Sequence, residues 1–391
     1  MTPAARIEAA IGILDEILAG MAAEKALTNW GRSSRFAGSK DRAAVRDHVF
    51  QALRCRRSHA VLGGGETGRG LLLGALREQG GDPSEIFTGL GHAPAPLSEA
   101  EMQAPRSFSS QAESCDIPDW LWPVFERSLA EQAEAAALAL RHRAPTHLRV
   151  NLRKTTRDAA IARLAAEGIT AVAHPASPTA LDVTEGARKI RTCDSYMLGF
   201  VELQDAASQA VVDALPLQDG MRVLDYCAGG GGKSLAMAGR ADLTLFVHDA
   251  EPRRMKDLPE RAARAGVQIR CLETADLAAQ VPFDLVLCDA PCSGSGSWRR
   301  DPEGKWRLTQ AQLDAVTNLQ AQILDAASEL VVPGGVLALA TCSMLDVENQ
   351  AQTAAFLARH PGWQHVLDIG WQVQGGTDGF YVSVFRQETA Q

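Results

Sequence analysis

Apolar residues in the first part of the chain recur at three- and four-residue spacing, the pattern of helices with one buried face. Residues 4–23 carry such a stripe, residues 41–62 repeat it, and residues 71–76 supply another short apolar face. The stretch 93–115 is rich in proline, serine and alanine and has no useful periodicity. The sequence therefore predicts an all-helical bundle over residues 1–92 and a linker over 93–115.

The next part, residues 116–205, mixes helical and strand patterns. Residues 117–143 favour a helix, with Asp116 as a candidate cap. A short strand is predicted over 146–153, then a helix that ends at Gly168, then further short strands. We therefore expect a compact α+β segment.

From residue 220 onward, short runs rich in valine, leucine and isoleucine alternate with helix-like stretches. Each run is too short for a buried helix, and this alternation indicates a parallel sheet covered by helices on both faces. A last run, 380–385, is expected to close the sheet as an antiparallel edge. The sequence thus predicts an α/β domain over residues 206–391, whose other strands are 221–226, 243–248, 267–272, 283–288 and 336–341.

Composition is typical of a folded protein with several domains. Of 391 residues, 46% are hydrophobic and 22% charged, both near the globular average. The longest apolar stretches are interrupted and fall short of the about 20 residues that span a bilayer. The eight cysteines include no CxxC pair, and the N-terminal stripe is amphipathic rather than a signal peptide. We expect a cytoplasmic monomer with reduced thiols, without a metal site and without membrane contact.

Charge is distributed unevenly along the chain. The formal net charge is −8, yet residues 25–57 hold nine lysines and arginines against Asp41 and Asp47, a local excess of +7 that leaves −15 elsewhere. A basic helical region favours contact with nucleic-acid phosphates. The alternative is a solvated helix face without a partner.

Polar or reactive residues follow every predicted strand of the α/β domain, at the edge where open α/β sheets bind ligands. A loop with four successive glycines, within residues 225–234, follows the first strand and lets a ligand approach the backbone. Asp249, after the second strand, suits a ribose diol, and Asp276, after the third, could accept a hydrogen bond from an adenine amine. Together these residues predict a nucleoside-containing cofactor.

Two alternatives stay open for this region. The Gly-Lys-Ser sequence resembles a P-loop, although Cys227 stands where that motif needs its first glycine. Asp249 could be a helix cap, because Pro252 follows it at the spacing of a helix start.

Two cysteines follow the fourth and fifth predicted strands. Cys292 lies just after Asp289, and Cys342 lies between a threonine and a serine. If these strands are neighbours, about 5 Å apart, both thiols face one crevice. Cys342 also precedes a helix predicted near Asp346, whose dipole would favour the nucleophilic thiolate. Cys288, inside the strand, is expected to be a buried structural residue, and the same role is the alternative for Cys292.

Several short motifs occur together along the chain. They are Leu148-Arg-Val-Asn-Leu, Gln204-Asp-Ala-Ala-Ser-Gln, the loop Asp225 to Ser234, Asp289-Ala-Pro-Cys-Ser-Gly-Ser-Gly, Arg300-Asp-Pro, Thr341-Cys-Ser-Met with Glu348 and Asn349, and Thr377-Asp-Gly-Phe. This set resembles the RsmB/Nop/Sun (Fmu) family of S-adenosylmethionine-dependent RNA cytosine-5 methyltransferases. The N-terminal helices resemble the NusB-like RNA-binding domain of its bacterial members, in a shorter form.

The resemblance implies a Rossmann-like class I methyltransferase domain with a mostly parallel seven-stranded sheet, behind the α+β segment and the NusB-like bundle. It implies S-adenosylmethionine as the methyl donor and RNA, specifically small-subunit ribosomal RNA, as the substrate. Cys342 matches the family nucleophile, Cys292 the cysteine that helps to release the product, and Asp289 an acid for the cytosine N3/N4 edge. Implied cofactor contacts are Cys227, Ala228, Gly229, Gly230, Gly231, Gly232, Lys233, Asp249 at the ribose, Asp276 at the adenine, and Asp289.

Candidate RNA contacts come from two motifs. Residues 298–307, just beyond Cys292, interleave cations with tryptophans, which suits single-stranded RNA. A charged surface loop with buried tryptophans is the alternative. The second motif is Leu148-Arg-Val-Asn-Leu, so that the candidates are Arg149, Asn151, Arg299, Arg300 and Lys305.

The glycine loop departs from the family pattern. Family members usually have Ala-Pro-Gly-Gly-Lys where this chain has Gly229 to Lys233. Because glycine adds backbone freedom that must be lost on binding, weaker cofactor affinity is expected.

Two rival functions remain. A DNA cytosine-C5 methyltransferase would use Cys292 as the nucleophile, and an RNA-binding assembly factor without catalysis would need neither cysteine. A pair of crevice cysteines beside Asp289 argues against both.

Overall fold

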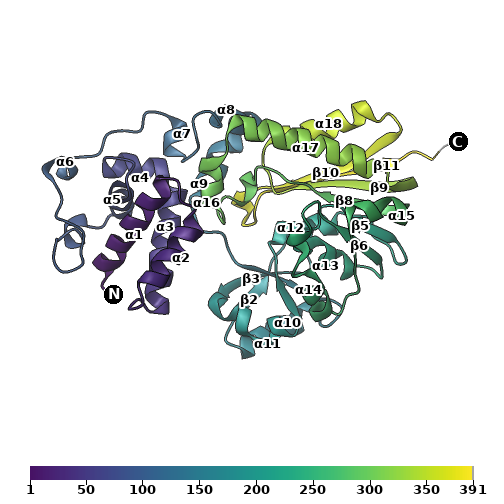
Figure 1. Ribbon diagram of the computed structural model, residues 1–391, viewed down its shortest axis with the longest axis horizontal. Helices are drawn as coiled ribbons and strands as arrows, with labels where there is room; N and C mark the ends of the chain where they lie inside the picture. Colours follow the sequence, from purple (N-terminus) through teal and green to yellow (C-terminus); the bar gives the residue numbers. More distant parts are fainter. Residues whose placement is uncertain (390–391) are drawn as a thin grey trace. The chain divides into compact units, whose positions relative to one another are not determined.

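The computed structural model describes residues 1–389 and divides into two compact units, a helical unit and a sheet unit. Figure 1 gives the labels of their elements. None of the helices within residues 1–389 combines the length and the apolar composition needed to cross a bilayer. The helical unit comprises residues 1–126, 130–143 and 298–307, and the sheet unit comprises 127–129, 144–297 and the residues from 308 on.

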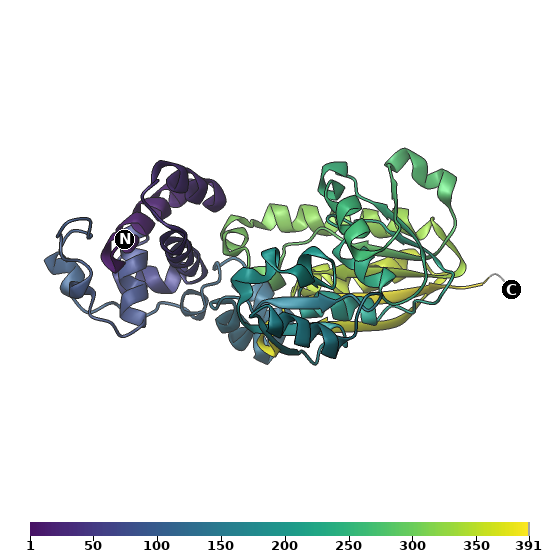
Figure 2. The same ribbon diagram turned by 90° about the horizontal axis from the view of Figure 1, so that it is seen from below.

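The helical unit packs its amphipathic helices around one apolar core, and Figure 2 shows α1 to α5 gathered together. Helix α1 begins where the Thr2 hydroxyl accepts a hydrogen bond from the Ala5 backbone amide (3.2 Å), with Pro3 in the first turn. Core residues include Leu14 of α1 and Val49 of α3. The elements are α1 (Pro3–Leu18), α2 (Ala23–Ser33), α3 (Ser39–Arg54), α4 (Arg56–Gly63), α5 (Gly68–Glu78), η1 (Pro83–Glu85), α6 (Glu99–Met102), α7 (Gln111–Ser114), α8 (Trp122–Leu129), η2 (Ala130–Gln132), α9 (Ala133–Leu140) and α16 (Pro302–Arg307).

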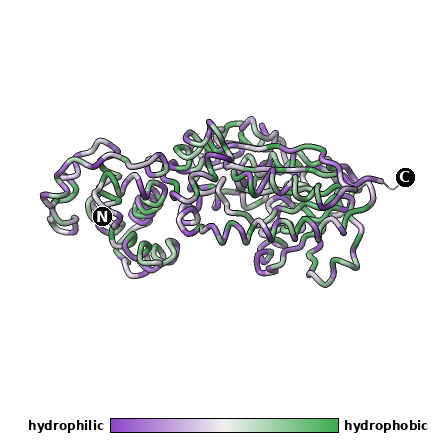
Figure 3. Tube along the Cα trace, turned by 90° about the horizontal axis from the view of Figure 1, so that it is seen from above, coloured by the Kyte–Doolittle hydropathy of each residue, from purple (hydrophilic) through white to green (hydrophobic). Residues whose placement is uncertain are grey.

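The predicted N-terminal helices are present, with two differences. The stripe over 41–62 forms two helices, α3 and α4, which meet at Cys55. Helix α2 was not predicted, because its buried face consists of alanines, one leucine and a glycine and gives a weak apolar signal. In Figure 3 the tube of these helices alternates between hydrophilic and hydrophobic colours, as expected for amphipathic helices.

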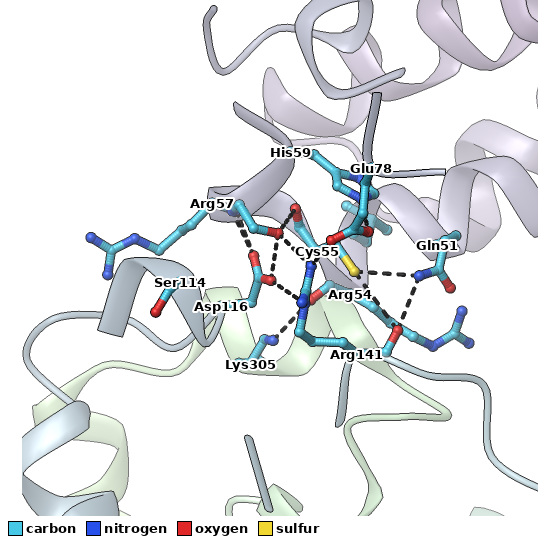
Figure 4. A network of polar contacts seen from close by, with 12 residues as sticks. Gln51, Arg54, Cys55, Arg57, His59, Glu78, Ser114, Asp116, Arg141 and Lys305 are labelled. Carbon is cyan, nitrogen blue, oxygen red and sulfur yellow. Dashed lines mark hydrogen bonds and ion pairs between the residues drawn. The ribbon is translucent and has the colours of Figure 1, made fainter. Parts of the chain in front are cut away.

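The region 116–143 differs from its prediction. Residues 117–143 form α8, η2 and α9 rather than one helix. Asp116 does not cap α8; its carboxylate accepts hydrogen bonds from the backbone amides of Arg57 (2.8 Å) and Ser58 (2.9 Å) at the start of α4. Asp116 is fully buried and pairs with Arg141 at 2.8 Å (Figure 4). A residue distant in sequence thus supplies the cap.

The sheet unit begins with a small antiparallel sheet in the order β2-β3-β1-β4. Its apolar face packs against α10, which begins at the Thr156 cap. The α+β prediction for this part is confirmed. The elements are β1 (His147–Val150), α10 (Arg157–Ala166), β2 (Thr170–Ala173), β3 (Ala180–Glu185), η3 (Ala187–Thr192), α11 (Asp194–Met197) and β4 (Val201–Leu203).

A seven-stranded sheet follows, in the order β10-β11-β9-β8-β5-β6-β7. Strands β5 to β9 are parallel, and β11 is antiparallel to β9, as the sequence predicts. Edge strand β10 was missed, because most of its residues are exposed and form no apolar run. The strands are β5 (Arg222–Asp225), β6 (Thr244–His248), β7 (Arg270–Leu272), β8 (Phe283–Asp289), β9 (Val331–Thr341), β10 (Trp363–Trp371) and β11 (Phe380–Gln387).

Successive residues of each central strand face opposite layers of helices, as a pleated strand requires. Leu287 joins a cluster with α12, α13 and α14, whereas its neighbour Val286 joins a cluster with α17 and α18. Both sheet faces are therefore buried, and ligands can reach only the strand ends. The helices are α12 (Ala206–Asp213), α13 (Gly232–Ala238), η4 (Pro252–Met255), α14 (Leu258–Ala265), η5 (Thr274–Asp276), α15 (Leu277–Gln280), η6 (Ser295–Ser297), α17 (Gln310–Ser328), η7 (Asp346–Glu348), α18 (Gln350–Arg359) and η8 (Val373–Gly375).

Candidate active site

The two cysteines lie side by side beyond the ends of adjacent parallel strands. Asp289, the last residue of β8, pairs in register with Ala340 of β9. Cys292 and Cys342 follow within three residues, and their sulfur atoms are 3.4 Å apart. Both side chains are partly exposed, whereas Cys288 within β8 is completely buried. The predicted closeness of the two thiols is confirmed, and their roles stay predictions.

The two thiols differ in acidity. A hydrogen bond from Cys292 lowers the pKa of Cys342, and the nearby Lys233 ammonium and the Ser297 hydroxyl lower it further. The same hydrogen bond and burial raise the pKa of Cys292 well above that of an ordinary thiol. Cys342 is therefore the sulfur that ionises more readily, and ionised sulfur is the nucleophilic form.

The source of this acidity differs from the sequence prediction. Only the three-residue η7 begins at Asp346, and α18 begins at Gln350. The neighbouring thiol and the Lys233 ammonium, rather than a long helix at Asp346, account for the lowered pKa of Cys342.

Lys233 and Asp289 form an ion pair beside the cysteines, with 2.7 Å between Nζ and Oδ1. Lys233 is buried in the first turn of α13, whereas Asp289 is partly exposed. Burial alone would lower the pKa of Lys233, but the charge and the hydrogen bond of Asp289 raise it. The pair joins the end of the glycine loop to the strand that leads to Cys292.

The glycine loop is held tightly at three positions. Gly229 and Gly231 have φ of +51° and +75°, a region that favours glycine. A Cβ at Gly231 would lie 2.1 Å from Cδ1 of Leu258. The Gly229 amide donates to Asp249 (2.9 Å), and the Ala228 amide donates to the carbonyl of His248 (2.8 Å). The loop follows β5 and is fixed against Leu258 and Asp249.

Asp225, at the end of β5, is buried and accepts a hydrogen bond from the Ser234 hydroxyl (2.5 Å), while its other oxygen has no partner within the described residues. Burial raises the pKa of Asp225 to about 7. Burial likewise raises the pKa of Cys227. A buried carboxyl oxygen without a protein partner beside a glycine cradle fits a polar ligand group.

Asp249 directly follows β6, and Asp276 is the last residue of η5, which comes after β7. Asp249 is buried and bound to the Gly229 amide and to Arg254, with 3.0 Å to its guanidinium. Asp276 is exposed, and its carboxylate accepts from the backbone amide of Glu273 (3.3 Å). Both lie beyond strand ends on the glycine-loop side of the sheet, and their contacts with ribose and adenine stay predictions.

Arg149 and Asn151 were predicted as RNA contacts, but their side chains are used inside the sheet unit. Arg149 is only 6% exposed, and its guanidinium donates to Gln204 and to the carbonyl of Gly232 (2.7 Å). The Asn151 amide donates to the carbonyls of Gly199 (3.0 Å) and Ala265 (2.9 Å). This geometry favours a structural role, in which Arg149 braces the glycine loop, over an exposed RNA contact.

Residues 298–307 pack into the helical unit. Arg54 donates to the carbonyl of Arg299 (2.8 Å), and the Trp306 indole donates to that of Leu53 (2.6 Å). Lys305 is 1% exposed, and burial lowers its pKa to about 8. Of the three predicted RNA contacts in this segment, only Arg300 is exposed. The alternative of a charged surface loop with buried tryptophans describes the segment only in part, because Trp298 is buried but so are the cations Arg299 and Lys305.

One cluster among the described residues has the composition of a metal site, and Figure 4 shows it in the helical unit. The ligand atoms of Cys55, His59 and Glu78 lie within 4.8 Å of one another. Arg141, however, forms an ion pair with Glu78, and burial raises the pKa of Cys55 to about 12. A guanidinium in the cluster and a protonated thiol disfavour a cation, so we interpret it as a structural network.

Comparison with known families identifies the sheet unit. The profile described as "16S rRNA methyltransferase RsmB/F" matches residues 212–384, and a ferredoxin-like domain of the same proteins matches 117–188. Over 298 residues the chain is 32% identical to the ribosomal RNA small subunit methyltransferase B of Vibrio vulnificus, with 72% of this chain and 69% of that protein covered. The chain belongs to the RsmB/F family.

Other RsmB/F relatives resemble the chain at similar sequence identity and coverage. The methyltransferase B of Xanthomonas campestris pv. campestris is 36% identical over 260 residues, covering 64% of this chain and 59% of that protein. The protein of Pseudomonas putida is 35% identical over 286 residues, covering 68% and 65%. The chain thus spans about three fifths of the length of these curated relatives.

Solved structures support the fold. PH0851 covers 99% of both chains with a TM-score of 0.78 at 21% identity. A methyltransferase homolog from Pyrococcus horikoshii covers 71% of this chain and 97% of its own, with a TM-score of 0.63 at 22% identity. The predicted methyltransferase fold is confirmed.

Sequence reasoning missed two parts of the site. One is the hydrogen bond from Arg149 in the small sheet to the Gly232 carbonyl at the start of α13. No local sequence pattern indicates this contact, because the two residues are far apart in the sequence. The buried Glu348 was noted as part of a motif without a role, although it contacts the residues that follow both cysteines.

Proposed function

We propose that this RsmB/F member transfers a methyl group from S-adenosylmethionine to C5 of a cytosine in RNA, with small-subunit ribosomal RNA as the substrate. The observation that carries the proposal is the 3.4 Å contact between the sulfurs of Cys292 and Cys342, beside the Lys233–Asp289 pair. The match to a profile described as a 16S rRNA methyltransferase supports the substrate.

Cytosine C5 is a poor nucleophile, and a thiolate overcomes this by covalent catalysis. The Cys342 thiolate adds to C6, and the electron pair of the C5–C6 bond becomes available at C5. S-adenosylmethionine, when bound, supplies a methyl group on a positively charged sulfur as the electrophile. The target base must be unstacked or in a loop to reach the crevice.

Release of the product needs a second group. After methylation the C5 proton leaves to a base, the C5–C6 double bond re-forms, and Cys342 departs as a thiolate. Cys292 lies at hydrogen-bonding distance of that sulfur, and its raised pKa keeps it protonated, so that it stabilises the departing charge. Asp289 is partly exposed beside the pair and is our candidate for the N3/N4 edge of cytosine.

The residues around the glycine loop fit the methyl donor. The loop brings backbone close to Lys233 and Asp289, and the buried oxygen of Asp225 has no protein partner within residues 1–389. Asp249 orders the loop through the Gly229 amide, and it is our candidate for the ribose hydroxyls. The proposed contacts are Cys227, Ala228, Gly229, Gly230, Gly231, Gly232, Lys233, Asp249, Asp276 and Asp289.

RNA binding by the helical unit is proposed at α2, α3 and the turn between them. Six basic residues there are exposed. Three of them, Arg32, Arg42 and Arg46, line a groove of about 380 Å³ together with Trp30. Cations beside an aromatic ring suit an RNA backbone with an unstacked base. The six are Lys25, Arg32, Arg35, Lys40, Arg42 and Arg46.

The rival functions are less well supported. A DNA-type mechanism needs the Cys292 thiolate, and the raised pKa of Cys292 opposes its formation. A non-catalytic assembly factor gives no reason for a cysteine pair with one acidified thiol.

Bisulfite sequencing of total RNA tests the proposal. RNA from a strain that lacks this protein is compared with RNA from the parent and from a strain complemented with Cys342→Ala. Because 5-methylcytosine resists deamination by bisulfite, we expect one 16S cytosine to be protected in the parent strain. That cytosine should be deaminated in the deletion strain and in the strain complemented with Cys342→Ala. Unchanged protection at every 16S cytosine would refute the proposal.

A further inference from the structure

A buried carboxylate lies behind the cysteine pair. Glu348, at the end of η7, is completely buried. Its oxygens accept hydrogen bonds from the Ser293 backbone amide (2.7 Å), the Ser293 hydroxyl (2.5 Å), the Ser343 hydroxyl and the Gln320 amide (3.3 Å). All four donors are uncharged. Burial of a carboxyl group is costly unless donors converge on its oxygens, and four donors do so here.

The partners of Glu348 have a specific place in the sequence. Ser293 directly follows Cys292, and Ser343 directly follows Cys342. One carboxylate therefore fixes the turn that carries each cysteine. Asn349 strengthens the second turn, since it accepts from Thr341 (2.6 Å) and donates to the Ser343 carbonyl (3.0 Å).

Charged neighbours act on both thiols. The pKa of Cys292 is raised by its contact with Cys342, by burial and also by the negative charge of Glu348. At Cys342, the charge of Asp289 raises the pKa and the charge of Lys233 lowers it. Glu348 thus disfavours the Cys292 thiolate, and Lys233 favours the Cys342 thiolate.

We propose that Glu348 is the positioning residue of the cysteine pair: it holds both cysteine turns together and directs ionisation to Cys342 rather than Cys292. This inference rests on the proposed function, in which Cys342 attacks and Cys292 stays protonated. Glu348 does not touch the substrate; it acts through Ser293, Ser343 and the field at Cys292.

The test measures thiol labelling in the free full-length protein. Rates of alkylation by iodoacetamide are followed for Cys292 and Cys342 between pH 6 and 10, with each site resolved by peptide mass spectrometry. The variant Glu348→Gln removes the charge and retains the size. Glu329→Gln is the matched control, because it removes the same charge from an exposed position before β9. The buried Cys288 reports unfolding.

We expect Cys342 to label faster than Cys292 in the native protein and in Glu329→Gln. In Glu348→Gln the ratio of the two rates should fall by about tenfold, the equivalent of one pKa unit, as the pH profile of Cys292 moves to lower pH. A ratio within twofold of the native value, with Cys288 unlabelled, would overturn the inference.

A second variant decides the case if Glu348→Gln exposes Cys288. Ser343→Ala keeps the charge and removes one hydrogen bond from the Cys342 turn, so the rate ratio should fall severalfold while Cys288 stays protected. An unchanged ratio in that variant would refute the proposal that Glu348 positions the two cysteine turns. Labelling needs neither RNA nor a methyl donor, so it can fail or succeed independently of the methylation experiment.

Discussion

The ammonium of Lys233 lies 2.7 Å from a carboxylate oxygen of Asp289, joining the helix after the glycine loop to the strand that leads to Cys292. The same ammonium lowers the pKa of Cys342. One buried cation therefore connects the proposed cofactor loop, the proposed base-binding acid and the proposed nucleophile.

Replacement of Lys233 should move the pH dependence of Cys342. Because a lowered pKa makes the thiolate available at lower pH, Lys233→Gln should raise that pKa and shift the acid limb of Cys342 alkylation upward by about one pH unit. The profile is measured without ligands. An unchanged limb would mean that the hydrogen bonds from Cys292 and Ser297 set the acidity without Lys233.

Two neighbouring glycines should respond differently to alanine. Gly231 has φ of +75° and a Cβ there would strike buried Leu258, so Gly231→Ala should cost about 1–3 kcal/mol and weaken methyl-donor binding. Gly230→Ala is the matched control for stability, since its Cβ would meet only the end of the flexible Arg261 side chain at 3.0 Å. Thermal unfolding compares the stability of the two variants, and calorimetric titration of Gly231→Ala with S-adenosylmethionine measures binding. Equal losses of stability in the two variants would contradict this account of the loop.

Asp225 should make the free protein less stable as the pH rises. Burial raises its pKa to about 7 from 3.8, so between these values the native state holds a proton that the unfolded chain has released. The free energy of unfolding therefore falls from about pH 4 to pH 7, by at most about 4 kcal/mol for three pKa units. Asp225→Asn lacks this titration and keeps an acceptor for Ser234. Denaturant titrations give the free energy of unfolding of each protein at each pH. The value for Asp225→Asn minus the value for the native protein should rise between pH 4 and pH 7. If this difference stays constant with pH, the raised pKa is contradicted.

The basic surface of α2 and α3 should carry RNA phosphates. The double variant Arg32→Ala, Arg42→Ala removes two exposed cations beside Trp30. The slope of log affinity for a 16S rRNA fragment against log salt should decrease by about 1.4, at about 0.7 per lost contact to single-stranded RNA. Arg188→Ala with Arg191→Ala removes the same charge from exposed η3 positions and serves as the control. Equal slopes in both double variants would place the RNA elsewhere.

Much of the fold and the central site could be predicted from the sequence. Buried parallel strands are recognisable as short apolar runs, and the residues just after them meet at one edge of the sheet. This rule predicts that Cys292 and Cys342 lie close together. Edge strand β10 and helix α2 were missed for the same physical reason: exposed or alanine-lined faces leave a weak hydrophobic pattern.

The predictions that the structure disfavours concern polar side chains whose partners lie far away in the sequence. Arg149 and Lys305 look like surface cations in sequence, yet both are buried and bonded to backbone carbonyls. Asp116 looks like the cap of the helix after it, yet it caps α4. Such partners are chosen by tertiary packing, which local spacing does not record.

Covalent trapping tests the central claim most directly. Each of the variants Cys292→Ala and Cys342→Ala is incubated with S-adenosylmethionine and 16S rRNA, and adducts are resolved on denaturing gels. We predict that Cys292→Ala accumulates a protein–RNA adduct, because the attacking thiolate remains while release is impaired, and that Cys342→Ala forms none. An adduct with Cys342→Ala and none with Cys292→Ala would contradict the assignment of the nucleophile.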